Sequence, residues 1–315
     1  MYSKYIDNAD INNSNILTVS QVADRIVSTA NTLNQQEKDP FTGSGLDFDA
    51  KKYSEDSSVI NINNRNIEYN SVEFSFMQVR SGQESNPVFN ERIKVVSGNI
   101  VIYSDGGSVQ YLINRARGSV ALSLLRKLNS SERNKVIEAQ KFDFSEDLIF
   151  WIISRFMNNQ NELDENSHLS IEQIIGFKGE GQEKQAVLSG SGNQVMNLLG
   201  TLAFLAEMDS IKQVGLRFDV SGDKFEIVLY SDNSQLDVII DNYVGNYMFE
   251  QVEERRAKVL ISIFMSLLPN VIDAYKNDDD WKNNGQAEFV RNIVSRAKNR
   301  MDEIAKQYPL EQTTS

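Results

Sequence analysis

Residues 214–240 read VGLRFDVSGDKFEIVLYSDNSQLDVII, and this segment decides the fold class. Apolar and polar side chains alternate along three short runs within it, which is the pattern of half-buried β-strands. The turn sequences 221–223 and 231–234 separate the runs, and turns this short connect antiparallel neighbours. The segment is therefore predicted to form a three-stranded antiparallel meander.

A second antiparallel element is predicted nearer the N-terminus. Strand-like alternation begins at 72–76, and two further runs, 100–102 and 109–113, flank the sequence Asp-Gly-Gly at 105–107. Two adjacent glycines readily supply the positive φ angles of a tight turn, so these runs are predicted to form a hairpin.

Helical patterns occupy other stretches of the chain. Thr18 and Gln21 form a capping box, and Ser145 is placed to cap an almost wholly apolar helix that reaches Met157. Short helices are predicted at 119–128 and 131–140, and two long ones at 250–276 and 285–308. Strands in some stretches and helices in others indicate an α+β fold with mixed or antiparallel sheets.

Three regions are predicted from this pattern. Residues 1–70 hold an N-terminal helix and a flexible segment, because periodicity disappears between about 35 and 70. Residues 71–160 form one α+β domain, and residues 161–315 form a second that carries the C-terminal helical pair. No residue-level repeat decides whether the two halves are a duplicated fold.

Composition excludes several kinds of catalytic site. The 315 residues include no Cys and one His, His168, so disulfides, thiolate nucleophiles, Cys-ligated zinc and multi-histidine metal centres cannot form within one chain. No nucleophile-elbow pentapeptide is present. We therefore expect no metal and no cofactor, leave the catalytic residues unassigned, and favour a non-enzymatic protein.

Charge and hydropathy bear on location. Thirty-two Lys and Arg against 44 Asp and Glu give a net charge of −12, which repels nucleic acid and anionic membranes at long range. The N-terminus is too polar for a signal peptide, and the apolar run 259–268 is about half of the ~20 residues that a membrane span needs. We expect a cytoplasmic protein without membrane insertion. The wealth of Asn, Lys and Ile suits a bacterial or phage chain from an AT-rich genome.

Two glycine-rich segments are candidates for phosphate binding. Gly176 and Gly181 have the spacing that opens a Walker A loop, with Lys178 between them, but Gln182 and Glu183 stand where that loop has Lys and Ser or Thr. A plain hairpin turn is the alternative. The second segment precedes a predicted helix, whose N-terminus favours an anion, although a simple helix cap explains the same residues: Gly190, Ser191, Gly192 and Asn193.

Acidic residues at 278–280 resemble the start of a calcium loop. Counted from Asp280, however, Lys282 and Arg291 occupy positions three and twelve, where an EF-hand has an oxygen ligand and a Glu. The calcium interpretation is rejected.

The last predicted helix carries two patterns. One is a cluster of cations that could contact nucleic acid, or that could belong to a solvated face with Asp302 and Glu303: Arg291, Arg296, Lys298 and Arg300. The other is an apolar seam with alternating spacings of three and four, for which we predict an interface: Val290, Val294, Ala297, Met301 and Ile304. Periodicity alone does not distinguish an intermolecular seam from an internal one.

These patterns favour an intracellular binding or assembly protein. We expect it to be a subunit of a bacterial or mobile-element multi-component system that contacts a copy of itself or another protein. The alternative is a nucleic-acid or nucleotide-phosphate binding protein, including a hydrolase, that uses the glycine-rich segments and the basic helix.

Overall fold

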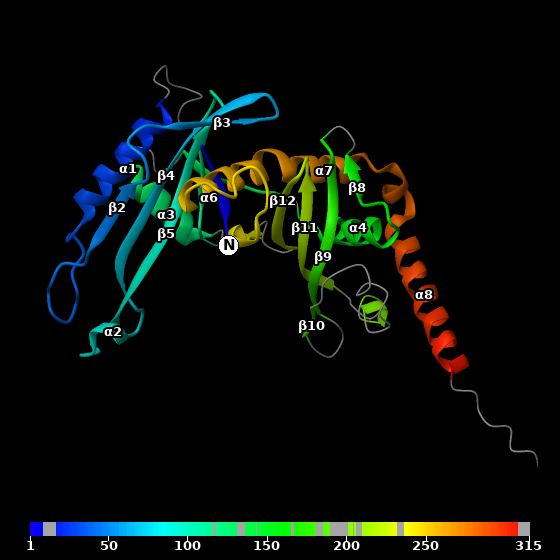
Figure 1. Cartoon of the computed structure of the whole chain (residues 1–315). Helices are drawn as coiled ribbons and strands as arrows, with labels where there is room; N and C mark the ends of the chain where they lie inside the picture. The colour runs from blue at the N-terminus through cyan, green and yellow to red at the C-terminus, as the bar shows by residue number, and fades with distance from the viewer. Residues whose placement is uncertain are drawn as a thin grey trace, which may run out of the picture. The chain divides into compact units, whose positions relative to one another are not determined.

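The computed structural model has the α+β architecture that the sequence predicts (Figure 1). It consists of two compact units, Met1–Phe142 with Asn246–Ser266, and Asp143–Gly245 with Leu267–Ser315. The structure describes residues 1–8, 17–115, 118–130, 136–142, 144–164, 167–180, 185–189, 201–203, 205, 210–231 and 236–307.

The first unit is built on an antiparallel sheet. Among the described residues this sheet has seven strands, ordered β2-β4-β5-β6-β1-β7, with β3 also paired to β4. Residues 100–113 form the predicted hairpin, because Ile100 and Ile102 lie opposite Ile113 and Tyr111. The strands are β1 (Ser3–Asp7), β2 (Phe48–Lys52), β3 (Ser58–Ile62), β4 (Arg65–Val79), β5 (Ile93–Ser104), β6 (Gln110–Ile113) and β7 (Ile137–Gln140).

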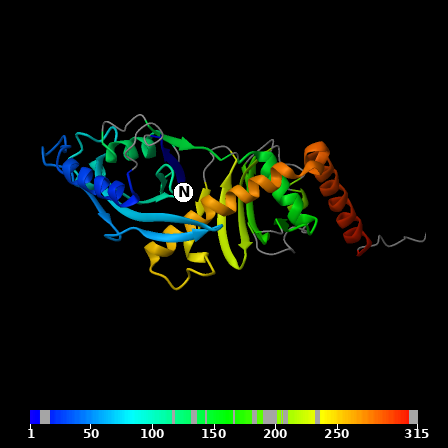
Figure 2. The ribbon, with the colours of Figure 1, turned by 90° about the horizontal axis from the view of Figure 1, so that it is seen from above.

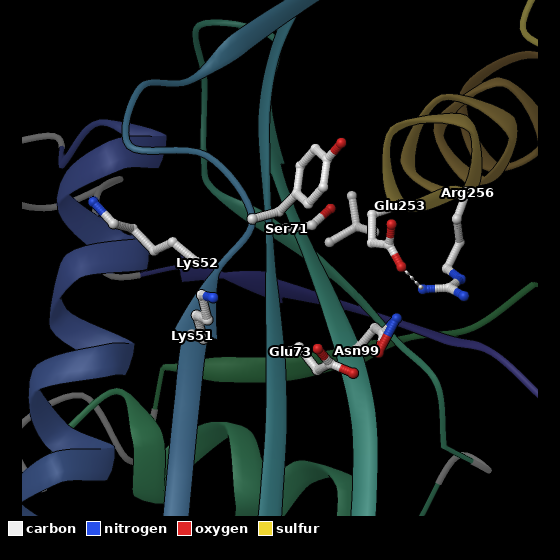
Figure 3. A pocket seen from close by; sticks show the side chains of 9 residues that line it. Lys51, Lys52, Ser71, Glu73, Asn99, Glu253 and Arg256 are labelled. Atoms are coloured by element: carbon white, nitrogen blue, oxygen red, sulfur yellow. Dashed lines mark ion pairs between the residues drawn. The ribbon is translucent and has the colours of Figure 1, made fainter. Parts of the chain in front are cut away.

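Helices cover both faces of this sheet. Helices α1 (Val19–Leu33) and α3 (Ser119–Leu128) share one core with the even-numbered residues of β4 and β5, such as Val72 and Ile102. Helix α6 (Val252–Ser262) lies on the opposite face, as Figure 3 shows for β2, β4 and β5. The predicted capping box of α1 is present, since Gln21 N donates to Thr18 Oγ1 and Thr18 N donates to Gln21 Oε1.

The segment expected to be flexible is part of this first unit. It contains β2, β3 and the start of β4, and a buried ion pair holds the loop before β2. Arg92, which ends the short helix α2 (Phe89–Arg92), donates to both carboxylate oxygens of Asp39 at 2.6 and 2.7 Å. These hydrogen bonds hold the pKa of Asp39 far below its usual range. Local periodicity misses this order because a contact across 53 residues creates it.

Two further expectations differ from the structure. Residues 137–140 form the edge strand β7 beside β1 and not the end of a short helix, because β-pairing overrides the helical pattern. The chain also crosses between the two units more than once, so the contiguous division 1–70, 71–160 and 161–315 does not match the units observed.

The second unit holds another antiparallel sheet. Its six described strands are ordered β10-β9-β11-β12-β13, with β8 paired to β9, and the predicted meander is formed by β11, β12 and β13. The helices whose bounds fall within the described residues include α4 (Glu146–Met157), α7 (Leu268–Asn277) and α8 (Gln286–Gln307). The strands are β8 (Glu162–Asp164), β9 (Leu169–Glu180), β10 (Gln185–Ser189), β11 (Ser210–Val220), β12 (Asp223–Tyr230) and β13 (Leu236–Val238).

Helix α4 is the central helix of this unit, as its apolar sequence predicts. Ser145 caps it, with Leu148 N donating to Ser145 Oγ at 3.1 Å. The side chains Leu148 to Ile153 are all buried, and the helix packs on β9 and β11. A helix that is apolar nearly all round needs partners on several sides, and here the sheet, α7 and α8 supply them.

The helical stretch Val252–Asn277 consists of α6, a π-helical turn at Ile263–Leu267, and α7. By length and composition it could cross a membrane, but 61% of its most apolar window is buried inside the protein. The core helix of a soluble protein meets the same criteria, so this observation adds no information about location.

Lys4 is an unusual buried cation on β1. Its side chain is 6% exposed, and Nζ lies 5.7 Å from the ring centres of both Tyr103 and Phe142. Burial lowers the pKa of Lys4 from 10.5 to about 8, and the charge of Asp105 only partly offsets this shift. The protonated amine therefore destabilises the first unit at neutral pH.

We predict that Lys4→Met stabilises the protein at pH 7, by up to about 3 kcal/mol if the whole pKa difference is recovered. Between pH 8 and 10.5 the folded wild type releases this proton before the unfolded chain does, so its free energy of unfolding rises with pH. The difference in free energy of unfolding between Lys4→Met and the wild type should therefore shrink as the pH rises from 8 to 10.5. Urea unfolding followed by far-ultraviolet circular dichroism measures it, with Lys51→Met, at an exposed position, as the control.

Candidate functional site

A pocket lined mostly by residues with polar or charged side chains lies between the first sheet and the start of α6 (Figure 3). Its volume is about 280 Å³. Lys51, Glu73 and Asn99 occupy matching register positions on β2, β4 and β5, so the three residues form a row across the sheet. Glu253 and Arg256 extend towards this row from the first turns of α6. The remaining lining residues are Lys52, Tyr53, Ser71 and Val101.

The charged groups of this pocket largely neutralise one another. The Asn99 amide faces Arg256, and the amide orientation that satisfies both of its polar atoms has the oxygen accepting from Arg256 and the nitrogen donating to Gly98 O at 3.0 Å. The Arg256 guanidinium lies 4.0 Å from the Glu253 carboxylate. Lys52 turns away towards α1, where its Nζ lies 2.6 Å from Asp24, and this contact raises the pKa of Lys52. Glu73 and Glu253 would repel a phosphate group. The pocket therefore suits a small polar molecule of balanced charge better than an anion.

Lys178 lies in a strand and not in the expected turn. It belongs to β9, opposite Val187 on one side and Gln213 on the other. Gly176 likewise pairs with Ser189 and Gly215, so the backbone around Lys178 is part of the sheet and does not form a phosphate-binding loop. The other predicted phosphate-binding residues lie outside the described part of the chain: Gly190, Ser191, Gly192 and Asn193.

The first half of α8 packs against α4. Phe289, Ile293 and Ala297 are its buried residues, and they recur every four positions along one side of the helix. The ring of Phe289 meets Phe150 edge to face at a centroid distance of 6.2 Å. Arg296 donates to Met157 O and to Asn158 Oδ1, both at 2.9 Å. It therefore provides hydrogen bonds to the C-terminal end of α4.

Two tryptophans hold the corner between α7 and α8 against α4. Trp151 Nε1 donates to Asp278 at 2.8 Å, and Trp281 Nε1 donates to Asp147 at 2.9 Å. Asp278 also accepts from the backbone N–H of Trp281. A Cβ on Gly285 would lie 2.5 Å from the Trp281 ring, so glycine is required at this corner. Asp278 of the acidic run at 278–280 thus has a structural role.

The side of α8 that adjoins the packed one is apolar and exposed. Val290, Val294, Met301 and Ile304 are 37%, 53%, 51% and 37% exposed. At 3.6 residues per turn they fall within about a quarter of the helix circumference and extend over about 21 Å. We call these four residues the α8 stripe. Of the predicted seam only Ala297 is internal, so the seam is divided between a packed and an exposed side.

The second half of α8 makes no buried contact. Every residue from Lys298 to Gln307 is exposed, and this part of α8 points away from the strands of its unit in both views (Figures 1 and 2). Isolated helices this short are marginally stable in water, since helix nucleation is unfavourable and packing usually supplies the stability. An exposed helical end with an apolar stripe is therefore typical of a surface that another helix covers.

The structure separates the predicted basic cluster into groups with different contacts. Arg296 is used in the contact with α4, and Arg300 lies 2.8 Å from Glu303 in an exposed pair. Arg291 and Lys298 are exposed, and the described residues provide neither with an ion-pair partner within 4.0 Å. Only part of the predicted nucleic-acid surface is thus available.

Sequence reasoning missed Phe289 and Ile293 as the packed side of α8, and it missed the pocket in the first unit. The spacing of Phe289, Ile293 and Ala297, with Trp281 just before, is a signal that could have identified the packed side. The pocket residues come from three strands and a helix far along the chain, so no local pattern brings them together.

No known protein family matches the chain, and no curated protein is similar to it in sequence.

The two sides of α8 should respond differently to truncation. Phe289→Ala removes a buried ring that packs on Phe150 and Trp281, so we expect it to lower the free energy of unfolding by about 3–5 kcal/mol. Val290→Ala, one position on and exposed, should change it by less than about 0.5 kcal/mol. Urea unfolding followed by tryptophan fluorescence reports on this unit, which contains Trp151 and Trp281. Equal losses would contradict the assignment of the two sides.

Proposed function

We propose that this chain is a non-enzymatic binding or assembly protein that joins another protein through the α8 stripe. The observation that carries the proposal is the exposure of four large apolar side chains in one line on a helix whose last ten residues have no buried contact. Contiguous exposed apolar surface of this kind marks interaction sites.

The energetics of association support a helical partner. Fully burying an exposed apolar side chain contributes about 1.5–3 kcal/mol, and the residues of the stripe are 37–53% exposed, so each has roughly half of that contribution left to gain. Association costs about 4–15 kcal/mol in lost freedom, so a partner must cover the whole stripe and add further contacts beside it. A second helix laid along α8 covers the stripe, because its four residues fall at positions a and d of a heptad pattern, at spacings of four, seven and three, with the buried Ala297 at the position between Val294 and Met301.

The alternative, a nucleic-acid or nucleotide-phosphate binding protein, has less support. Its proposed phosphate-binding lysine lies in a sheet, one of its four arginine and lysine residues packs against α4, and carboxylates line the pocket of the first unit. The cytoplasmic location and the bacterial or mobile-element system stay predictions from composition.

The proposal predicts that Val294→Glu with Met301→Glu releases the partner. Native mass spectrometry of the full chain, purified at low salt from the cells that make it, should show the wild type bound to additional protein mass. The double variant should appear at its own monomer mass, close to 35.7 kDa, with an unchanged melting temperature because both positions are exposed.

Ser295→Glu with Asn299→Glu is the matched control. It adds the same charge on the far side of α8, where no apolar stripe exists, and should leave the assembly intact. A wild-type chain found only as a monomer, or a stripe variant that keeps its partner, contradicts the proposal.

A further inference from the structure

We infer that the α8 stripe binds an amphipathic helix of a different protein, one whose apolar seam is bordered by Asp and Glu, and not a second copy of this chain. This inference rests on the proposed function and specifies the chemistry of the partner. It is carried by the charges that border the stripe.

Cations flank the stripe on both sides, at three of the seven neighbouring positions on α8. In a heptad that places Val294 and Met301 at position a and Val290, Ala297 and Ile304 at position d, Arg291 and Lys298 occupy position e. Arg300 occupies position g on the other side. No acidic residue stands at any e or g position of α8, since the remaining ones are Gln286, Ile293, Ala305 and Gln307. The nearest carboxylates, Asp302 and Glu303, lie farther round the helix.

This arrangement disfavours a homodimer through α8. The side chains at e and g of two paired helices meet across the seam and decide which partners associate. In an antiparallel pair of α8 helices position e faces position e, so Arg291 and Lys298 meet like charges, which is unfavourable. In a parallel pair position e faces position g, and the three cations meet Gln286, Ile293 and Ala305, so no ion pair forms. A helix with Glu or Asp at these positions pairs with the same three cations.

Two features of the chain are compatible with an acidic partner. Both side chains of the Arg300–Glu303 ion pair are exposed, so the pair contributes little to the stability of the protein. Arg300 can therefore leave Glu303 and pair with a carboxylate of the partner. The net charge of −12 repels an acidic partner at long range, but at physiological salt the Debye length is about 8 Å and this repulsion is screened. The cations that touch the partner then determine the electrostatic part of the binding free energy.

The α8 surface combines an aliphatic stripe with flanking cations, and this combination also distinguishes it from a nucleic-acid site. Nucleic-acid contacts without base stacking come mainly from cations on phosphates, and such contacts leave an aliphatic stripe uncovered. The final basic cluster has no interleaved aromatic residue among those described, as the sequence predicts.

The test uses the full chain and two synthetic helical peptides of about three heptads with the same Val and Leu seam. One peptide carries Glu at its e and g positions and the other carries Lys. Fluorescence anisotropy should show the Glu peptide binding at least about tenfold more tightly, and about 0.5 M salt should reduce this preference. Arg291→Glu, Lys298→Glu and Arg300→Glu together should reverse it.

A charge-matched control variant combines Lys276→Glu, Lys282→Glu and Lys306→Glu, at exposed positions in the same unit away from the stripe. This control should keep the preference for the Glu peptide. Circular dichroism of both triple variants should match the wild type, because none of the six positions is buried.

The other outcomes separate this inference from the proposed function. Equal binding of the two peptides, or a self-dimer that Val294→Glu with Met301→Glu dissociates, overturns the acidic-partner inference and leaves the stripe as an interface. A monomer that binds neither peptide overturns both. Tight binding of a single-stranded oligonucleotide, lost in the Arg291, Lys298 and Arg300 variant, overturns both in favour of nucleic acid.

Discussion

The direction of α8 depends on the reciprocal contacts of two tryptophans with two aspartates. Trp151 on α4 donates to Asp278 at the end of α7, and Trp281, in the π-helical turn Trp281–Gly285 that precedes α8, donates to Asp147 on α4. Tyr275 also donates to Asp147, at 2.6 Å. These hydrogen bonds are directional, whereas the apolar contacts around them are not, so they determine how α8 leaves α4. The divided character of α8 follows, with one side packed and another exposed.

In both units, helices bury the apolar face of an antiparallel sheet, but the helices that do so differ. Each has an antiparallel sheet with an apolar face, and each buries that face under helices whose apolar residues match it. In the first unit α1 and α3 cover one face and α6 the other, and the buried pair of Arg92 and Asp39 fixes the long loop before β2. In the second unit the nearly all-apolar α4 is the central helix. Helix α8, by contrast, extends beyond the core of its unit, since every residue from Lys298 to Gln307 is exposed.

Sequence patterns predicted the elements whose cause is local. The meander at 214–240, the hairpin around Asp105, the capping box at Thr18 and the cap at Ser145 depend on neighbouring residues, and all are present. The ordered segment around β2 and β3, the strand β7, the discontinuous units and the pocket depend on distant pairings. Lys178 was likewise not predictable from its neighbours in the sequence. Glycines on both sides of it suggest a turn, but pairing with β10 and β11 places it in a strand.

The seam of α8 shows why periodicity alone does not decide between internal and external contacts. The spacing of Val290, Val294, Ala297, Met301 and Ile304 indicates only that a helix should cover this side. A second pattern on the same helix, formed by Phe289, Ile293 and Ala297, competes for the contact with α4. The larger aromatic ring lies nearest to the Trp281 corner, and burying it excludes more apolar surface from water than burying a valine would. The packed side is therefore the aromatic one, and the aliphatic stripe with its bordering cations stays exposed.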